Sequence, residues 1–204
     1  THPDLVMSLS SLFHEASCDV PVCGIDEVGR GPWAGPVVAA AVILDPASVP
    51  AGLNDSKKLS PGMRRELDRE LRGCALIGIG MASVEEIDRL NVLAASMLAM
   101  SRALTALPQA PRHALIDGNR LPELPCPATA IVGGDGLCAS IAAASIVAKV
   151  ARDALMADLA QTHAGYGWER NAGYGTREHQ EGLARLGVTP HHRRSFRPIA
   201  ALLA

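Results

Sequence analysis

Several short apolar stretches in this sequence run into acidic residues, and this arrangement constrains the fold more than any other feature. The stretches are Pro21–Ile25, Ala114–Ile116 and Thr129–Val132, and the acids that follow them are Asp26, Glu27, Asp117 and Asp135. Apolar runs this short are typical of buried strands. Because the carboxyl ends of strands in α/β sheets border a common crevice, we expect these acids to meet there.

Two further apolar stretches, Val37–Leu44 and Cys74–Met81, predict strands that form an antiparallel meander with the first one. Gly78 and Gly80 lie within the second stretch, and they are small enough to let another element pack closely over the sheet. A length of 204 residues suits one domain with a substantial core.

Helical patterns fill much of the remaining sequence. The expected helices are Asn91–Leu107, Ala139–Leu159 and one running from Thr176 to Leu186, and the expected helix starts are Ser60-Pro61 and the capping box Ser83-x-x-Glu86. Hairpins early in the chain and alternation of strands with helices later predict an α/β fold with a mixed sheet.

The acids at the strand ends predict a divalent metal site. Carboxylate oxygens are the ligands that Mg²⁺ and Mn²⁺ prefer, and no cluster of His or Cys in the sequence favours zinc. Two ions roughly 3.5 to 4 Å apart could support hydrolysis of a phosphodiester.

Asp26 and Glu27 raise a geometric difficulty, because neighbouring residues on a regular strand point to opposite faces. We therefore expect the strand to distort there, with Gly29 and Gly31 allowing a bulge or twist. The alternative is that both acids cap a turn.

Basic residues occur in several segments that could contact phosphates. These segments are Gly29-Arg30-Gly31, Lys57-Lys58 before a helix start, Lys149 and Arg152 on the long helix, and the stretch from His191 to Arg197. Arg binds phosphate in bidentate fashion, and Gly permits close approach of the main chain. Most Gly-x-Gly segments are ordinary turns, and a solvated surface loop is ordinarily the better explanation of the two lysines. A solvated face explains the remaining basic residues equally well.

Composition excludes several classes of protein. Aromatic residues make up only 3% of the chain, which argues against a reader of single strands that stacks bases on aromatic platforms. The five cysteines lack the paired spacing of a zinc site and are interpreted as free thiols. Arg102 and Lys149 interrupt the two most apolar runs and no signal peptide is recognised, so we expect a cytoplasmic protein that spans no membrane.

Taken together, these segments resemble the ribonuclease HII family from Cys23 to Pro198. The motifs that carry the resemblance follow in the family's order: Gly24–Gly31, Asn54–Leu59, Ile116–Asn119, Gly134-Asp135, Ala143–Asp153 and Gly173–Thr176. The resemblance implies a ribonuclease H-like mixed sheet flanked by helices, with a small C-terminal helical extension. It places a catalytic domain at residues 19–162 and a substrate-binding extension at 163–204, with 1–18 outside the main motifs.

The resemblance also implies roles for individual residues. Asp26, Glu27, Asp117 and Asp135 correspond to the catalytic, metal-binding carboxylates. Gly29, Arg30 and Gly31 correspond to the loop that recognises the ribose 2′-OH, and Tyr174 to the aromatic residue against that sugar. The other residues that we expect to bind substrate are Lys57, Lys58, Ser145, Lys149, Arg193 and Arg194.

Asp135 and Asp153 compete for the place of the fourth ligand. A helix rises about 1.5 Å per residue, so Asp153 should lie roughly 20 Å or more from the start of its helix near Asp135. We therefore choose Asp135 and expect Asp153 to be structural, pairing with Lys149 or Arg152 or capping a loop.

The expected activity is cleavage of the RNA strand of RNA–DNA hybrids and cleavage 5′ to single ribonucleotides embedded in duplex DNA. It would leave 3′-OH and 5′-phosphate ends and use Mn²⁺ or Mg²⁺, with two ions per site when substrate is bound. We expect a monomer, and no sliding-clamp motif is evident. The alternatives are a related nuclease or metal-dependent phosphatase, and a hybrid-binding module without catalysis.

Overall fold

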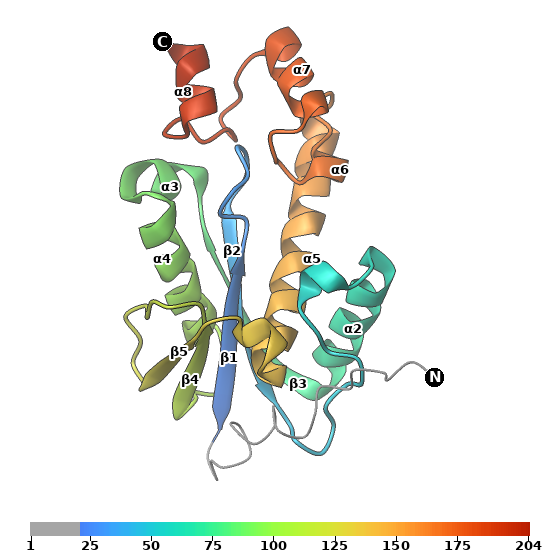
Figure 1. Cartoon of the computed structure of the whole chain (residues 1–204), viewed down its shortest axis with the longest axis vertical. Coiled ribbons are helices and arrows are strands. Elements are labelled where there is room, and N and C mark those ends of the chain that lie inside the picture. The colour runs from blue at the N-terminus through green and yellow to red at the C-terminus, as the bar shows by residue number, and fades with distance from the viewer. Residues whose placement is uncertain (1–20) are drawn as a thin grey trace.

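The computed structural model describes residues 21–204, and within them a twisted mixed sheet forms the centre of the molecule (Figure 1). The strands are β1 (Val22–Val28), β2 (Val37–Leu44), β3 (Ala75–Ala82), β4 (His113–Asp117) and β5 (Ala128–Ile131). Their order across the sheet is β3-β2-β1-β4-β5. β1, β2 and β3 pair antiparallel, which confirms the predicted meander, whereas β4 pairs parallel to both β1 and β5.

One face of the sheet is covered by α4 (Val92–Thr105), which follows α3 (Val84–Leu90). The close approach expected at Gly78 and Gly80 is confirmed, because a Cβ atom at either residue would overlap the main chain of α4 or the residues just after it. Alternate residues of β1 and β2, such as Ile25 and Ala39, pack against α4 in this layer. The small residues of β3 therefore set the distance between the sheet and this helix.

The opposite face is covered by α5 (Ala139–Thr162), with α2 (Pro61–Cys74) beside it (Figure 1). The buried part of α5 is rich in alanine, and Gly24 on β1 lies against the main chain of Ser140 and Ile141. A helix without large side chains on its inner face can lie close to the sheet. This close packing brings Ser145 of α5 to the acidic end of β1.

The predicted helix starts are confirmed by their cap hydrogen bonds. Ser60 accepts from the N–H of Met63 at the start of α2, and Ser83 forms a complete capping box with Glu86 at α3. Thr176 accepts from the N–H of His179 at the start of α7 (Arg177–Leu186). Such caps satisfy main-chain N–H groups that the helix itself leaves without partners.

The end of the chain packs beyond the edge of the sheet, on the far end of α5 (Figure 1). This part of the chain contains α6 (Trp168–Asn171), α7 and α8 (Arg197–Leu203). Two 3₁₀ turns, Ser56–Lys58 and Gly134–Gly136, occur earlier in the chain, outside this C-terminal part. Trp168, Met156 and Ile199 form a separate small core with Ala34 from the segment between β1 and β2. No helix in residues 21–204 is long and apolar enough to cross a membrane. The expected segment 1–18, with Cys18, lies outside the described residues.

Candidate active site

Three acidic side chains from different segments meet at one edge of the sheet. Asp26 and Asp117 are adjacent there because Ile25 on β1 is paired with Ile116 on the parallel strand β4. Asp135 lies in the 3₁₀ turn that follows β5, and the N–H of Gly134 in this turn donates to Asp117 Oδ1 at 2.8 Å. One oxygen from each of Asp26, Asp117 and Asp135 lies within 4.8 Å of the others. We call these three residues the acid cluster.

The acid cluster is short of positive charge. Burial raises the pKa of Asp26 well above its ordinary value, and the carboxylates of Glu27 and Asp117 raise it further, against hydrogen bonds from the Glu27 N–H and Ser145. Burial also raises the pKa of Asp135, with Asp55 and Asp117 adding to the effect. The carboxylate oxygens of the acid cluster repel one another at this spacing, and a bound divalent cation would offset the repulsion. Such oxygens are the ligands that Mg²⁺ and Mn²⁺ prefer.

Glu27 does not join the acid cluster. The expected distortion of β1 is wrong, because its pairing with β2 continues without a break through Asp26, Glu27 and Val28. Asp26 therefore faces α5, whereas Glu27 faces α4 and lines a cavity of about 270 Å³ together with Met97, Arg30 and Asp117. Burial raises the pKa of Glu27, and the negative charge of Asp117 raises it further. The two carboxylates are therefore close enough to interact electrostatically.

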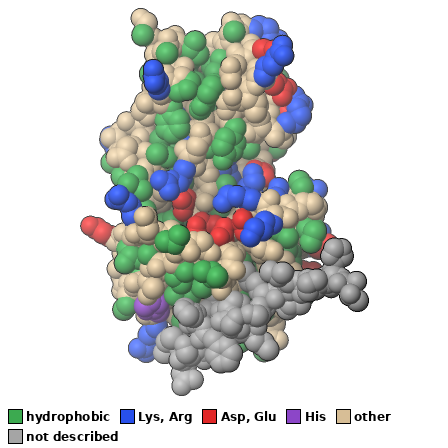
Figure 2. Space-filling view, viewed as in Figure 1, with side chains coloured by type: hydrophobic (Ala, Val, Ile, Leu, Met, Phe, Trp, Pro, Cys, Tyr) green, Lys and Arg blue, Asp and Glu red, His purple; other side chains and the backbone are tan. Residues whose placement is uncertain are grey.

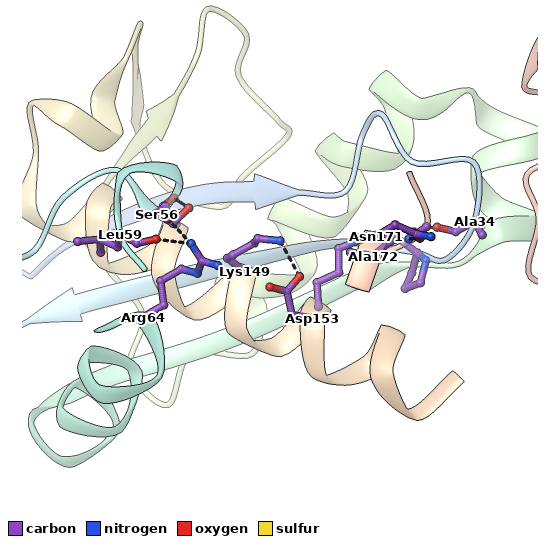
Figure 3. Close-up of polar contacts among 12 residues, drawn as sticks. Ala34, Ser56, Leu59, Arg64, Lys149, Asp153, Asn171 and Ala172 are labelled. Carbon is purple, nitrogen blue, oxygen red and sulfur yellow. Dashed lines mark hydrogen bonds and ion pairs between the residues drawn. The ribbon is translucent and has the colours of Figure 1, made fainter. Parts of the chain in front are cut away.

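The 3₁₀ turn Ser56–Lys58 brings a positive charge toward the acid cluster. Burial alone would lower the pKa of Lys57, but the carboxylates of Asp55, Asp26, Asp135 and Asp117 raise it above its ordinary value. The turn is held from below by Arg64, whose Nη1 donates to the carbonyls of Ser56 at 2.8 Å and Leu59 at 2.6 Å (Figure 3). Lys58 is exposed on the same turn.

Sequence reasoning missed Asp55 and Ser56. Asp55 caps the turn and adds to the negative charge around Asp135. The buried hydroxyl of Ser56 lies 2.7 Å from that of Ser145. In the sequence, the helix start at Ser60-Pro61 drew attention to the two lysines before it. Asp55 and Ser56 precede those lysines and carried no separate signal.

The loop after β1 has an inner side and an outer side. Gly29 is buried with a φ of 95°, and a Cβ atom there would overlap the side chain of Arg152, so the absence of a side chain makes room for that arginine. Arg30 and Gly31 are exposed, and the Cβ position of Gly31 lies 3.3 Å from the ring of Tyr174, which is 47% exposed. The two predicted ribose-recognition segments are therefore adjacent.

Two predicted substrate-binding residues lie on one side of α5. Ser145 is buried and contacts Asp26 and Ser56. Lys149, one turn later, forms an ion pair of 2.6 Å with Asp153 (Figure 3), which confirms the structural pairing expected for Asp153. Lys149 also lines a groove of about 430 Å³ between α2, α5 and α6 that contains Arg65.

Arg193 and Arg194 differ from each other in placement. Arg193 is fully buried and donates only to main-chain carbonyls, so the expected contact with a substrate phosphate is corrected: its guanidinium is turned into the protein. Arg194 is exposed, and its N–H donates to Asp88 of α3 at 3.0 Å. Figure 2 shows acidic side chains in the middle of one face with Lys and Arg side chains on both sides of them.

Comparison with known proteins shows which family this chain resembles. The family model for ribonuclease HII matches residues 23–199. A ribonuclease HII from Paramagnetospirillum magneticum is 65% identical over 183 residues, which are 88% of this chain and 91% of the relative. The structure of ribonuclease H2 from Pyrococcus horikoshii covers 89% of this chain and 96% of its own, with 26% identity and a TM-score of 0.73.

A more distant structure supports the fold alone. Bst-RNase HIII, solved in complex with Mn²⁺, has a TM-score of 0.73 and 19% identity over 95% of this chain and 72% of its own. The predicted mixed sheet with flanking helices is thereby confirmed as a ribonuclease H-like fold.

Proposed function

The chain belongs to the ribonuclease HII family, which implies ribonuclease H activity on RNA–DNA hybrids, and we propose that it also cuts 5′ to single ribonucleotides embedded in duplex DNA. The products would carry 3′-OH and 5′-phosphate ends. The observation that carries the proposal is that Asp117 of the acid cluster lines the same cavity as the exposed Arg30, whose neighbour Gly31 lies against the ring of Tyr174. A phosphodiester at the acid cluster would place a neighbouring sugar close to these residues.

We propose that Asp26, Asp117 and Asp135 hold divalent cations, Mn²⁺ or Mg²⁺, with Glu27 completing the site when substrate is bound. Two bound cations would supply positive charge to activate an attacking water and to stabilise the leaving oxygen. Lys57 would add a positive charge beside the scissile phosphate, since its ammonium group already experiences all three carboxylates of the acid cluster. The protein contributes orientation, because each acid is fixed by a strand end or a tight turn.

The extension at residues 163–204 would close over the duplex and present Tyr174 to the ribose. Contacts through Lys58, Lys149 and Arg194 would be made to phosphates, so base sequence should matter little. A 2′-OH is displayed in the wide minor groove of a hybrid helix, which is the groove that these residues would face.

A panel of substrates tests this proposal. The substrates are an RNA–DNA hybrid, a DNA duplex with one ribonucleotide, the same duplex made only of DNA, and a phosphomonoester, each with Mg²⁺, Mn²⁺ or chelator. We expect cleavage of the first two with either metal and none with chelator. Cleavage of the all-DNA duplex or of the phosphomonoester at a similar rate would contradict the proposal, and binding to hybrids without any cleavage would show a binding module instead.

A further inference from the structure

Two arginines are buried in this protein without a carboxylate partner among residues 21–204. Arg152 and Arg193 are each 0% exposed, and their guanidinium groups donate only to main-chain carbonyl oxygens. Burial lowers the pKa of Arg193 to about 9 and that of Arg152 to about 10, so both remain charged at neutral pH. A buried charge is costly unless it is fully hydrogen-bonded, and here main-chain carbonyl groups supply the hydrogen bonds.

Arg193 binds the segment between β1 and β2, residues 29–36, which we call the recognition loop. Its Nη2 donates to the carbonyls of Gly29 at 2.5 Å and Gly35 at 2.8 Å, and its Nη1 donates to that of Arg30 at 2.9 Å. The guanidinium carbon lies 5.1 Å from the centre of the Phe196 ring. One planar group thus joins both ends of the recognition loop from the side of the C-terminal segment.

Arg152 supports the same loop from α5. Its three nitrogens donate to the carbonyls of Pro36 at 2.9 Å, Ala34 at 3.1 Å and Ala172 at 2.9 Å. Gly29 and Gly35 have the positive φ angles that let the loop wrap around these side chains. The two arginines therefore hold the recognition loop by its carbonyl groups.

This arrangement determines where the N–H groups of the loop point. In a trans peptide the C=O of one residue and the N–H of the next point in opposite directions, and no peptide bond in residues 21–204 is cis. Because the carbonyls of Gly29 and Arg30 point inward to Arg193, the N–H groups of Arg30 and Gly31 point outward. Both residues are exposed, and neither N–H has a hydrogen-bond partner in the described part of the chain.

We propose that Arg193 is a positioning residue that turns the N–H groups of Arg30 and Gly31 toward the substrate, where they donate to oxygen atoms of the ribonucleotide. This inference rests on the proposed function. The oxygen could belong to the 2′-hydroxyl or to the adjacent phosphate. An all-DNA duplex has the phosphate but lacks the hydroxyl, so comparison with a duplex containing one ribonucleotide separates the two sources.

The first test is Arg193→Lys, which keeps the charge but has one nitrogen in place of a planar group that reaches three carbonyls. We measure, in chelator to prevent cleavage, the affinity for a DNA duplex with one ribonucleotide and for the same duplex without it. If the 2′-hydroxyl is the ligand, the preference for the ribonucleotide falls about tenfold while all-DNA affinity stays the same; if the phosphate is, both affinities fall about tenfold. Unchanged affinities in a folded Arg193→Lys protein would overturn the proposal.

A matched control is Arg177→Lys, because Arg177 is an exposed arginine whose Nε donates to Glu181 on the surface of α7. It should change neither affinity. Partial unfolding would lower the concentration of protein able to bind either duplex but would leave the dissociation constants unchanged. The active fraction is therefore titrated for each variant. This separates a positioning role from a purely structural one.

The second test does not depend on the substrate. Hydrogen–deuterium exchange should become faster in residues 29–35 of Arg193→Lys, with β1 and α4 unchanged. If Arg193→Lys fails to fold, Phe196→Leu removes the ring over the guanidinium without removing a hydrogen bond, and it should shift exchange and binding in the same direction but less. No change in exchange would overturn the proposal, whereas a wild-type protein with normal exchange and no preference for ribonucleotides would contradict the proposed function alone.

Discussion

The hydroxyl groups of Ser56 and Ser145 lie 2.7 Å apart, although 89 residues separate them in the sequence. Ser145 also hydrogen-bonds to the carboxyl group of Asp26. Because a serine hydroxyl has a single proton, an ionised Asp26 would take the proton of Ser145, and Ser56 would then donate to Ser145. The turn that carries Lys57 is thus connected to the most buried acid of the site through two hydroxyl groups.

Replacement of Ser145 by alanine tests this connection. Ser145→Ala leaves the buried hydroxyl of Ser56 and one oxygen of Asp26 without their partner, which should cost about 1–2 kcal/mol of stability and about tenfold in kcat. Thermal unfolding and steady-state cleavage of a hybrid measure the two effects. Ser101→Ala is the control, since the Ser101 hydroxyl donates to the Glu123 carbonyl on an exposed surface. Equal activity of both variants would show that the connection has no role in catalysis.

Asp117 should be essential for cleavage but not for folding. Its Oδ1 accepts from the N–H of Gly134, and an asparagine can keep this hydrogen bond while it removes the charge. We expect Asp117→Asn to melt within a few degrees of the wild type and to lose more than about 100-fold in kcat, or about 3 kcal/mol. Asp158→Asn, an exposed acid on α5, is the matched control. Cleavage by Asp117→Asn at the wild-type rate would disprove the assignment of the acid cluster.

The convergence of acids on one edge of the sheet could be predicted from the sequence, because strand ends are visible as the ends of apolar runs. The position of Glu27 outside the acid cluster follows from strand alternation, because the bulge expected after Asp26 does not form. The unbroken pairing of β1 with β2 shows that Gly29 bends the chain only after the strand has ended.

The burial of Arg193 could not be predicted from the sequence. Its neighbours form a basic, polar stretch that is typical of a surface, and the carbonyl of Gly35 that it binds lies 158 residues away. Such a contact depends on the tertiary arrangement of the C-terminal segment against the recognition loop. Local pattern carries no information about a main-chain carbonyl that distant in the sequence.

Divalent cations should stabilise the folded protein. Burial, and next the repulsion between carboxylates, raise the pKa of Asp26 and Asp135, and a bound cation would offset both effects. A ligand at 100 times its dissociation constant contributes about 2.7 kcal/mol. For a chain of this size that corresponds to an increase in Tm of about 5–11 °C. Thermal unfolding with Mn²⁺ and with chelator measures the difference. Asp26→Asn should melt higher than the wild type in chelator and respond less to Mn²⁺, and an undiminished response would place the cation elsewhere.

Packing between α5 and the sheet should tolerate no side chain at Gly24. A Cβ atom there would overlap the main chain of Ser140 and Ile141, so Gly24→Ala must displace α5 or β1, at a cost of about 1–3 kcal/mol or more. Because Asp26 is two residues away, kcat should fall as well. Gly73→Ala in α2 is the control: no atom lies within 4 Å of its Cβ position, and the change should stabilise the helix by about 0.5–1 kcal/mol. Equal stability of the two variants, measured by denaturant unfolding, would contradict the packing argument.

The histidines behind Tyr174 should make the fold sensitive to acid. His179 Nδ1 lies 2.9 Å from the Tyr174 carbonyl and therefore carries a proton, while its Nε2 accepts from Trp168 Nε1 at 3.1 Å. His192 Nδ1 accepts from the N–H of Thr189 at 3.0 Å, so its proton lies on Nε2, directed at His179 Nε2 at 3.0 Å. Each imidazole ring uses one nitrogen as a donor and the other as an acceptor, so its hydrogen bonds require the neutral form. A further proton would place an N–H group against another N–H donor.

The sign of the pH dependence follows from these contacts. Burial, and next the neighbouring His179, lower the pKa of His192 to about 4, whereas a histidine in the unfolded chain titrates near 6.5. As the pH falls, the unfolded chain binds the proton first, so the stabilisation is complete above about 6.5 and is lost progressively down to about 4. Between pH 7 and pH 5 the wild type should lose about 1–2 kcal/mol from this residue. His192→Gln should be less stable at pH 7 but should show a shallower dependence of Tm on pH, with the titrating carboxylates common to both proteins. Parallel Tm curves for the two proteins would rule out His192 as the acid-sensitive group.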